Sequence, residues 1–330
     1  MTERARAFDA FLADHGWAKA RVTPIKQDAS KRIFYRLSDP ASGTAILMQI
    51  PPDAAENPKD IIRLTQHLRG IGLGAPEILA INPTQTLMIT EDLGERRFAD
   101  EFIAAPQLQF ERYISAVDML AHLRLHGGDI EVPLGDPETL AAMIDPVFQY
   151  YCVTAIPDHQ RQDLTTHLYQ ILKQNLTGKM TLSLRDCHAE NLIWAGHKSG
   201  IAQVGIIDFQ DAFLTHPAYD LVSLLYDVRR DIAPDLRAKV VEHYIQKTQD
   251  DLDQFGAAMH AINVQRNLRI LGVFAKLAKQ GRPHYLAWAD RTWRYIQEGL
   301  THQTLAPLGN TIHALIPEPT ADHIAWLTHD

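Results

Sequence analysis

Three polar residues in the middle of the chain have the types and spacing of a phosphoryl-transfer site. Asp186 and Asn191 lie five positions apart, and Asp208 comes seventeen residues after Asn191, at the end of an apolar run. Phosphoryl transfer requires a carboxylate near the acceptor hydroxyl and separate oxygen ligands for the magnesium ions on the nucleotide. The pattern therefore predicts that Asp186 is catalytic and accepts or orients the acceptor proton, while Asn191 and Asp208 are metal ligands.

The segments around these residues indicate strands that end at the site. Residues 180–184 and 203–207 are apolar and strand-like, and residues 196–200 between them predict a hairpin turn. An Asp and an Asn five positions apart are common in ordinary loops, so this spacing alone is a weak signal. The strand that ends at Asp208 and the segment 219–225 beyond it favour kinase chemistry over an ordinary loop.

Longer stretches of the sequence carry a resemblance to a known family. They are residues 28–32, 47–52, 89–94, 185–188, 208–212 and 219–225, of which the last two are the most specific. On these residues the chain resembles the aminoglycoside phosphotransferase and choline kinase superfamily. More narrowly, it resembles the bacterial N-acetylmuramate/N-acetylglucosamine anomeric kinases of cell-wall recycling, over roughly residues 20–230.

The resemblance implies an α+β, protein-kinase-like fold with two lobes. Residues 1–92 would form a small nucleotide-binding lobe with an antiparallel sheet and a helix, and residues 93–330 a large, mainly helical lobe with the catalytic loop and acceptor site. The implied reaction transfers a phosphoryl group from ATP, with Mg²⁺, to the anomeric hydroxyl of N-acetylmuramate and/or N-acetylglucosamine in peptidoglycan recycling. The alternatives are a kinase of the same fold for an aminoglycoside, choline or another small alcohol, and a non-catalytic nucleotide-binding module.

The pattern of apolar residues changes from strands to helices near residue 92, without an internal repeat or a low-complexity tract. Before this point it predicts a helix at 2–15, strands at 32–37, 44–50, 77–81 and 86–90, and a helix at 58–69. The helix at 58–69 has Asn57 as its expected N-cap. After residue 92 the pattern predicts helices at 107–126, 136–152, 159–175, 217–228, 234–253, 259–280 and 284–300.

The segment that connects the two expected lobes is a candidate for binding adenine. In kinase-like folds this connection binds the base through backbone groups, so the resemblance assigns this role to Glu91, Asp92 and Leu93. Their side chains would matter little for that contact. A simple connector between lobes would have the same sequence character, and this alternative stays open.

A polar segment near the start of the small lobe lies where a phosphate-covering loop is expected. The hydroxyl of Ser30 and the charges of Lys31 and Arg32 suit phosphate oxygens, although a polar hairpin without a ligand is the alternative. Kinases of this superfamily usually carry a Lys on a strand and a Glu on the small-lobe helix. Residues 46–50 contain no Lys and residues 58–69 no Glu, so we expect Lys31 or Arg32 to replace the strand Lys.

Other polar residues near the site have roles that are less firmly indicated. His188, Glu190 and Asp211 flank it and are candidates for binding sugar hydroxyls, although a loop His is more often solvated or bonded to the backbone. Asp220 begins an apolar helix, where Asp is a capping residue, and the resemblance implies that it also supports the catalytic loop. Leu184 stands where the superfamily often has His, which removes one expected supporting hydrogen bond.

Composition favours a small-molecule enzyme. The formal net charge is −8, and 46% apolar with 22% charged residues is ordinary for a soluble globular protein. Cys152 and Cys187 are too few for a disulfide framework, and we find no signal-peptide core or eighteen-residue apolar run. We therefore expect a cytoplasmic enzyme with no membrane or nucleic-acid partner, and the pattern specifies no oligomeric state.

Basic residues alternate with aromatic residues in the last expected helices. They are Arg266, Arg269, Lys276, Lys279, Arg282, Arg291 and Arg294. Helical phasing predicts that the basic residues form a solvated face and that the aromatic residues are core or cleft walls, rather than a nucleic-acid surface. One or two of these arginines could instead bind the lactyl carboxylate of N-acetylmuramate.

Overall fold

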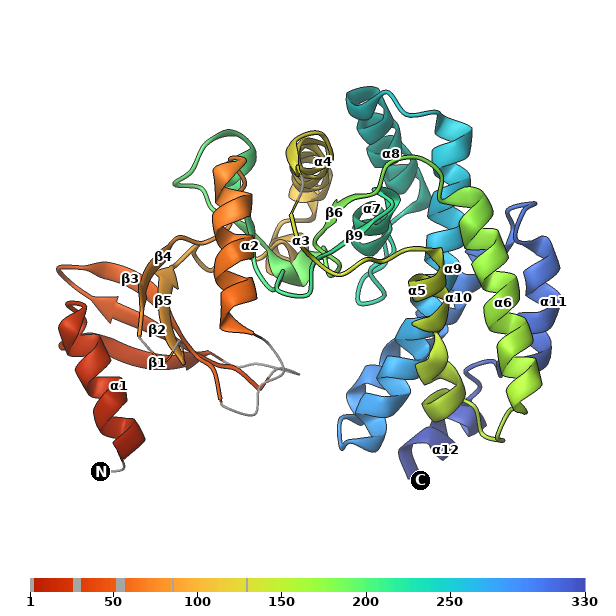
Figure 1. Cartoon of the computed structure of the whole chain (residues 1–330), viewed down its shortest axis with the longest axis horizontal. Helices are drawn as coiled ribbons and strands as arrows, with labels where there is room; N and C mark the ends of the chain where they lie inside the picture. Colours follow the sequence, from red (N-terminus) through yellow and green to blue (C-terminus); the bar gives the residue numbers. More distant parts are fainter. Residues whose placement is uncertain are drawn as a thin grey trace. The chain divides into compact units, whose positions relative to one another are not determined.

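A computed structural model describes residues 3–25, 31–51, 57–82, 84, 86–128 and 130–329. The chain forms two compact units, Met1–Met119 with Ala189–Asp211 and Leu120–His188 with Ala212–Asp330. We call them the sheet unit and the helical unit. The predicted α+β class is confirmed, because an antiparallel sheet is combined with many helices (Figure 1). The expected lobe boundary at residue 92 stays a prediction.

An antiparallel sheet with strand order β1-β2-β3-β5-β4 forms the core of the sheet unit. Its strands are β1 (Arg21–Ile25), β2 (Ile33–Asp39), β3 (Gly43–Gln49), β4 (Ile78–Ile81) and β5 (Leu87–Glu91). The sequence predicted all of these strands except β1. β1 was missed because it is an exposed edge strand that contains Pro24 and shows little apolar alternation.

Helices cover the two faces of this sheet. α1 (Glu3–Asp14) places Phe11 and Leu12 in one core cluster with Leu47 of β3, whereas the neighbouring residue Met48 packs with Ile61 of α2. This alternation follows from the two-residue period of a strand. Helix α2 (Pro58–Gly70) begins as predicted, because the side chain of its N-cap accepts a hydrogen bond from the backbone N–H of Lys59 at 3.1 Å.

The second half of the sheet unit contains two helices and a small hairpin. They are α3 (Phe98–Ala104), the first part of α4 (Gln109–His126), and strands β7 (Leu192–Trp194) and β8 (Val204–Ile206). Ile206 donates a backbone hydrogen bond to Gly74 O at 3.1 Å. Gly74 has to be glycine there, because a Cβ would overlap the backbone carbonyls of Ala202 and Val204. The hairpin is thereby attached to the segment between α2 and β4.

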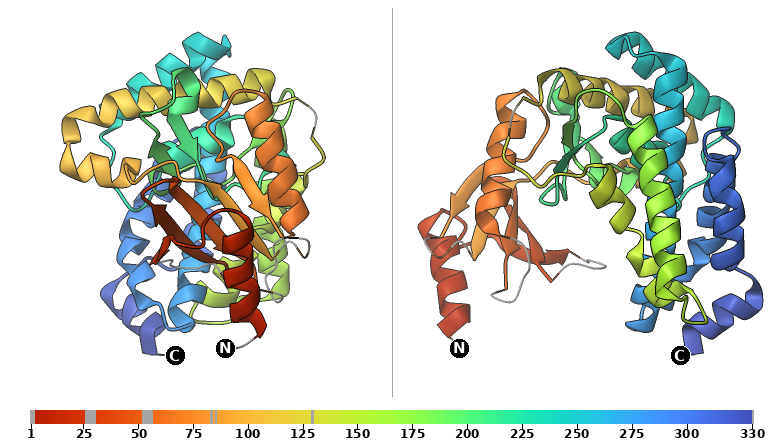
Figure 2. Two further views of the ribbon diagram at one scale, coloured as in Figure 1. Left: turned by 90° about the vertical axis from the view of Figure 1, so that its left-hand side faces the viewer. Right: turned by 45° about the vertical axis from the view of Figure 1, so that its right-hand side comes forward.

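The helical unit is built around α9 (Leu252–Lys279), which lies alongside α6 (Asp158–Asn175) in Figure 2. Strands β6 (Thr181–Ser183) and β9 (Phe213–Thr215) form its small sheet. Its other helical segments are α5 (Pro137–Ala142), η2 (Val147–Tyr151), α7 (Ala218–Leu225), α8 (Pro234–Thr248), η5 (Pro283–Trp288), α10 (Ala289–Leu300), α11 (Ala306–Leu315) and α12 (Ala321–His329). Within the described part of the chain, no helix has the length and apolar character needed to span a membrane.

Several expected helices have different ends from those predicted. The helix expected at 136–152 is split into α5 and the π-helical turn η2, and the one expected at 284–300 begins as the 3₁₀ segment η5. α8 ends at Thr248 because Gln249 adopts a φ of 58°, and α9 begins earlier than predicted because the Asp251 side chain caps it. Periodicity alone does not register such breaks.

Candidate active site

The loop after β6 carries Asp186, and α7 holds this loop through a buried carboxylate. Asp220 accepts hydrogen bonds from the Ser183 hydroxyl at 2.9 Å, from the Leu184 N–H at 2.8 Å and from the Arg185 N–H at 3.0 Å. Arg185 has a φ of 70°, a conformation that non-glycine residues rarely adopt. The carboxylate therefore offsets backbone strain immediately before Asp186.

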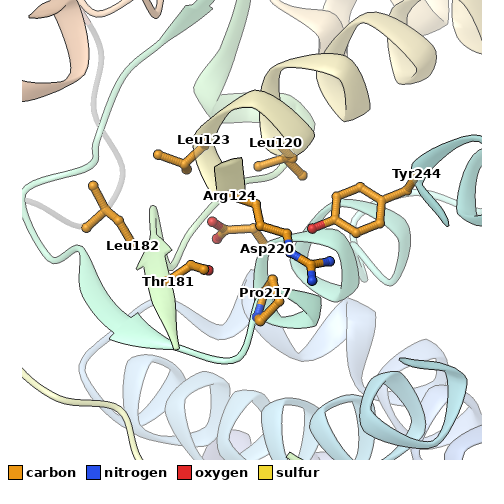
Figure 3. Close-up of a pocket in the computed structure, with 8 residues that line it drawn as sticks. All are labelled: Leu120, Leu123, Arg124, Thr181, Leu182, Pro217, Asp220 and Tyr244. Carbon is orange, nitrogen blue, oxygen red and sulfur yellow. The ribbon is translucent and has the colours of Figure 1, made fainter. Parts of the chain in front are cut away.

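A small pocket with both apolar and polar lining residues, among them Arg124, lies beside this carboxylate (Figure 3). Leu120, Leu123 and Leu182 line it together with Asp220 and the ring of Tyr244. Burial raises the pKa of Asp220 to about 6, and the hydrogen bonds from the loop backbone and Ser183 oppose this rise. Asp220 is therefore largely ionised at neutral pH, although its surroundings favour the protonated form.

Asp186 itself faces positive charge in the helical unit. Its side chain is 36% exposed, and its Oδ1 lies 3.4 Å from Nη2 of Arg266. Burial raises the pKa of the Asp186 carboxyl, but the charges of Arg266, Arg269, His188 and Arg185 together lower it by more, so this pKa lies below its ordinary value. Asp186 is thus an anion that can orient an acceptor hydroxyl.

Arg266 was wrongly assigned to a solvated face from the sequence. Its side chain is buried, and the same Nη2 that approaches Asp186 donates to the Ser223 hydroxyl at 2.6 Å. The available signal was the run of three polar residues, 265–267, among the apolar residues in the middle of the helix, and all three are buried. The prediction for the aromatic residues was correct for Phe274, which lies in a core cluster.

His188 lies two residues after Asp186 and is buried. Burial and the nearby charge of Arg229 lower its pKa to about 4, so the ring is neutral at physiological pH. Its Nδ1 has no hydrogen-bond partner among the described residues. The nearby carboxylate of Asp227 is engaged by the N–H of Arg229 at 3.1 Å and by Nε of Arg230 at 3.0 Å.

The sheet unit contains the residues predicted to bind metal. Asn191 ends the short turn Ala189–Asn191, and its carbonyl accepts the N–H of Ile207 at 3.0 Å. The β7–β8 register therefore places Asn191 opposite the residue before Asp208, so both predicted ligands lie at the same end of one hairpin. The predicted turn at 196–200 joins β7 to β8. The two predicted strands β6 and β8 do not pair with each other.

Arg32 binds the predicted metal ligand Asp208 directly. Its guanidinium is buried and donates from Nη2 to Asp208 Oδ1 at 2.6 Å and from Nη1 to Gln210 Oε1 at 3.1 Å. Gln210 in turn donates to Asp208 at 3.1 Å and to Asp211 at 3.3 Å. Asp208 has a φ of 60° and keeps its side chain 46% exposed. Lys31 is exposed, unlike Arg32.

The remaining nucleotide candidate near this arginine, Ser30, lies outside the described residues. Glu190, a candidate for binding sugar, lies in the turn immediately before Asn191 and is partly buried. The structure therefore groups Arg32, Asp208 and Asp211 in the sheet unit. Asp186, His188 and Asp220 belong to the helical unit.

The proposed adenine segment is held by its own side chains. Glu91 accepts from Nζ of Lys198 at 2.8 Å and from the N–H of Glu77 at 3.1 Å, and His197 lies 3.2 Å away. Burial raises the pKa of Glu91, but these hydrogen bonds lower it by more. The N–H of Glu91 donates to Glu77 O at 2.7 Å, so this donor is already used within the sheet.

The next two residues of this segment are also anchored by their side chains. Asp92 binds Nε of Arg36 at 2.8 Å and accepts the N–H of Gly94 at 2.9 Å. Leu93 is buried against Ile193 of β7. Side-chain anchoring of this kind fixes the backbone of the segment, which is the part expected to meet a base.

Comparisons with known proteins show the family of the chain. A sequence model of the phosphotransferase enzyme family (APH) matches residues 21–257. The chain belongs to this family, and it is an enzyme that transfers a phosphoryl group to a hydroxyl acceptor.

Two curated relatives match nearly the whole chain. The chain is 29% identical to an N-acetylmuramate/N-acetylglucosamine kinase of Caulobacter vibrioides, over 97% of this chain and 98% of the relative. It is 23% identical to the protein of the same description from Pseudomonas aeruginosa, over 93% of both chains.

Solved structures show the same fold. The choline/ethanolamine kinase family protein of Mesorhizobium loti matches with a TM-score of 0.61 at 15% identity, over 99% of both chains. The choline kinase LicA of Streptococcus pneumoniae matches with a TM-score of 0.63 at 11% identity, over 93% of this chain and 100% of the other. The predicted kinase-like fold is thereby confirmed.

Proposed function

We propose that this enzyme transfers a phosphoryl group from ATP, with Mg²⁺, to the anomeric hydroxyl of N-acetylmuramate and/or N-acetylglucosamine. The reaction would serve peptidoglycan recycling in the cytoplasm. The names of the full-length relatives support the choice of sugar. The family supports the choice of reaction.

The charge around Asp186 is the observation that carries the acceptor class. Arg266 and Arg269 are the groups whose charges lower the pKa of Asp186 most. A cationic acceptor such as choline or an aminoglycoside would be repelled by these guanidinium groups, whereas a neutral or acidic sugar would not. This observation favours a neutral or acidic N-acetylated amino sugar over the cationic alternatives.

Asp186 would orient the acceptor hydroxyl and take up its proton. Its lowered pKa keeps it ionised at neutral pH, which suits a transition state in which the attacking oxygen needs orientation more than a strong base. Asp220 would fix the loop that carries it. His188, Glu190 and Asp211 are our candidates for hydrogen bonds to sugar hydroxyls, because the unpartnered Nδ1 of His188 can accept one.

The donor atoms near the β7–β8 hairpin fit magnesium. Asn191 offers an amide oxygen and Asp208 a partly exposed carboxylate, and hard oxygen ligands of this kind are those that Mg²⁺ prefers. When bound, the ion would offset negative charge on the nucleotide phosphates. Arg32 would add positive charge beside Asp208 in place of the missing strand Lys, and Lys31 is the less favoured candidate because it is exposed.

The nucleotide base would meet the backbone of the segment that begins at the last residue of β5. Glu91, Asp92 and Leu93 remain our candidates, with the Glu91 N–H excepted because it is already bonded within the sheet. Ser30 would contact phosphate, as expected for the polar segment that contains it.

Phosphorus NMR tests this function directly. Protein, Mg²⁺ and ATP are mixed with N-acetylmuramate, N-acetylglucosamine, choline or an aminoglycoside. We expect a sugar phosphate whose signal is coupled to the anomeric proton, and its loss in Asp186→Asn. Asp322→Asn, the same substitution at an exposed position of α12, is the control. Phosphorylation of choline or the aminoglycoside instead would overturn the proposal, and ATP binding without any transfer would indicate a silent module.

A further inference from the structure

Arg269 is a cation of the helical unit that has no partner among the described residues. It lies on α9 three positions after Arg266, so the two side chains project from the same side of the helix. Arg266 is buried and engaged by Ser223 and Asp186. Arg269 is only partly buried, and no hydrogen bond, ion pair or aromatic ring of the described chain engages it. It is therefore available to a ligand that reaches Asp186.

The carboxylates of this part of the unit already interact with other arginines. Asp227 is bonded by Arg229 and Arg230, and Asp186 is approached by Arg266. The charge of Arg269 nevertheless acts on Asp186 and lowers the pKa of its carboxyl. An unbalanced guanidinium beside a catalytic carboxylate favours an acceptor that brings its own negative charge.

We propose that Arg269 binds the lactyl carboxylate of N-acetylmuramate and thereby determines the preference for an acidic acceptor. The inference rests on the proposed function. The lactyl group and the anomeric hydroxyl belong to one sugar ring and are separated by two ring bonds. A hydroxyl at Asp186 therefore brings the carboxylate into the neighbourhood of Asp186 without contact, which is where the charge of Arg269 acts. A guanidinium can bind a carboxylate through two parallel hydrogen bonds.

A guanidinium could also bind the transferred phosphate. Binding of the lactyl carboxylate and binding of the phosphate lead to different expected results. N-acetylglucosamine is the matched acceptor, because it differs from N-acetylmuramate only in lacking the lactyl group. If Arg269 binds the carboxylate, its loss affects only the acidic sugar. If it binds phosphate, its loss affects both sugars equally, and the apparent KM for ATP rises.

The test compares the full-length wild-type enzyme with Arg269→Met and Arg269→Lys, using both sugars. For Arg269→Met we expect kcat/KM for N-acetylmuramate to fall about 10- to 100-fold, mainly through KM, while the value for N-acetylglucosamine stays within about 2-fold. Arg269→Lys should recover part of the loss, because it restores the charge but not the bidentate geometry. Arg294→Met, at an exposed position of α10, removes the same charge and is the control.

Each other outcome is decisive. Equal losses for both sugars, or no loss for either, overturn the role of Arg269 while leaving the proposed function intact. A wild-type enzyme that phosphorylates N-acetylglucosamine but not N-acetylmuramate also overturns the role of Arg269. Calorimetric titration of N-acetylmuramate without nucleotide separates the role of Arg269 from the proposed function of the enzyme. If the wild type neither binds nor phosphorylates either sugar, the proposed function fails and the inference falls with it.

Discussion

We propose that Arg32, which immediately precedes β2, supplies the charge of the missing strand Lys. β3, the strand where the superfamily usually has its Lys, contains none, and Arg32 immediately precedes Ile33, which pairs with Gln49 of β3. The buried guanidinium therefore lies next to the strand that lacks the Lys, and it donates a hydrogen bond to Asp208. Phe34 lies 5.4 Å from it and further restricts its position.

Replacement of this arginine should weaken nucleotide binding. For Arg32→Ala we expect the apparent KM for ATP to rise at least about 10-fold, because a charge next to the proposed phosphate site and the restraint on Asp208 are both lost. Lys31→Ala is the neighbouring control and should change the KM by less than about 2-fold, because Lys31 is exposed. Steady-state kinetics at saturating sugar measures both. An unchanged KM for Arg32→Ala would contradict the assignment.

Local spacing was enough to single out Asp186, Asn191 and Asp208 as candidates, because they are close in sequence and their residue types match the chemistry. Arg266 could not be found in this way. It lies 80 residues from Asp186 along the chain, and its approach to that residue depends on how α9 packs. Our preference for Arg32 over Lys31 also required the structure, since the burial of Arg32 and its hydrogen bond to Asp208 are not visible in the sequence.

At the scale of the element, α9 depends on a glycine at its contact with η2. A Cβ at Gly272 would overlap backbone atoms of Pro146 and Val147, whereas a Cβ at Gly256 of the same helix meets nothing within 4 Å. The helix and the π-helical turn can therefore approach closely only at Gly272. A backbone contact leaves no flexible side chain to move aside.

These two glycines give a matched pair of substitutions. Gly272→Ala should lower the free energy of unfolding by about 2–3 kcal/mol through overpacking. Gly256→Ala should leave it unchanged or raise it by up to about 1 kcal/mol through helix propensity. Urea denaturation followed by circular dichroism measures both. Equal effects of the two substitutions would show that the close contact at Gly272 is unimportant.

The start of α7 should make stability depend on pH. His216 is buried and its Nδ1 accepts the N–H of Ala218 at 3.2 Å, which only the neutral ring can do. Burial and the charge of Arg124 lower the pKa of His216 to about 4. Because this value lies below the unfolded value of about 6.5, the stabilisation is fully present above about pH 6.5 and is lost as the pH falls towards 4.

His216→Asn tests this element, since Asn keeps a side-chain acceptor but does not titrate. We expect the loss of unfolding free energy between pH 7 and pH 4.5 to be smaller in the variant than in the wild type, by on the order of 2 kcal/mol. Denaturation curves at the two pH values give the difference. His243→Asn, a substitution on α8 outside this contact, is the control. Parallel pH profiles of wild type and His216→Asn would contradict the assignment.

Elements with a strong local signal were predicted well, and those fixed by packing were not. α2 has an N-cap, a proline at its start and a clear apolar stripe, and it begins at the predicted residue. β1 and β9 carry weak apolar patterns and exist through pairing with β2 and β6. The helix predicted at 136–152 is interrupted before Pro146, which lacks the N–H that a continuous helix would need, and η2 then packs against Gly272, which is distant in sequence.

At the scale of the whole molecule, the two units are interlaced in sequence. The sheet unit needs residues 189–211, which return to it after the whole of 120–188 has entered the helical unit. Within the sheet unit, this returning segment supplies Lys198 to Glu91 and Asp208 to Arg32, and Trp194 stacks with Arg112 at 3.7 Å. The resemblance predicted a two-lobed kinase, but the return of this segment depends on long-range pairing that periodicity does not encode.

A fragment of residues 1–126 should therefore fold poorly by itself. We expect weaker protection of its amides and a lower melting temperature than for the same fragment joined through a flexible linker to residues 189–211. The reason is that the shorter piece leaves the backbone carbonyl of Gly74 and the side chain of Glu91 without their hairpin partners. Hydrogen exchange and thermal unfolding measure the comparison. Equal stability of the two fragments would show that the hairpin is dispensable for the sheet.

The interlacing also has a consequence for synthesis of the chain. Translation must continue from residue 119 to residue 211 before the sheet unit is complete. At ordinary elongation rates this interval lasts roughly 5 to 20 seconds. For that time the nascent chain exposes the surface around Leu93 that β7 later covers, and such exposed apolar surface is what chaperones bind. The two segments of the sheet unit are thus synthesised at separate times. A pause in translation within 120–188 would prolong the time for which this apolar surface is exposed.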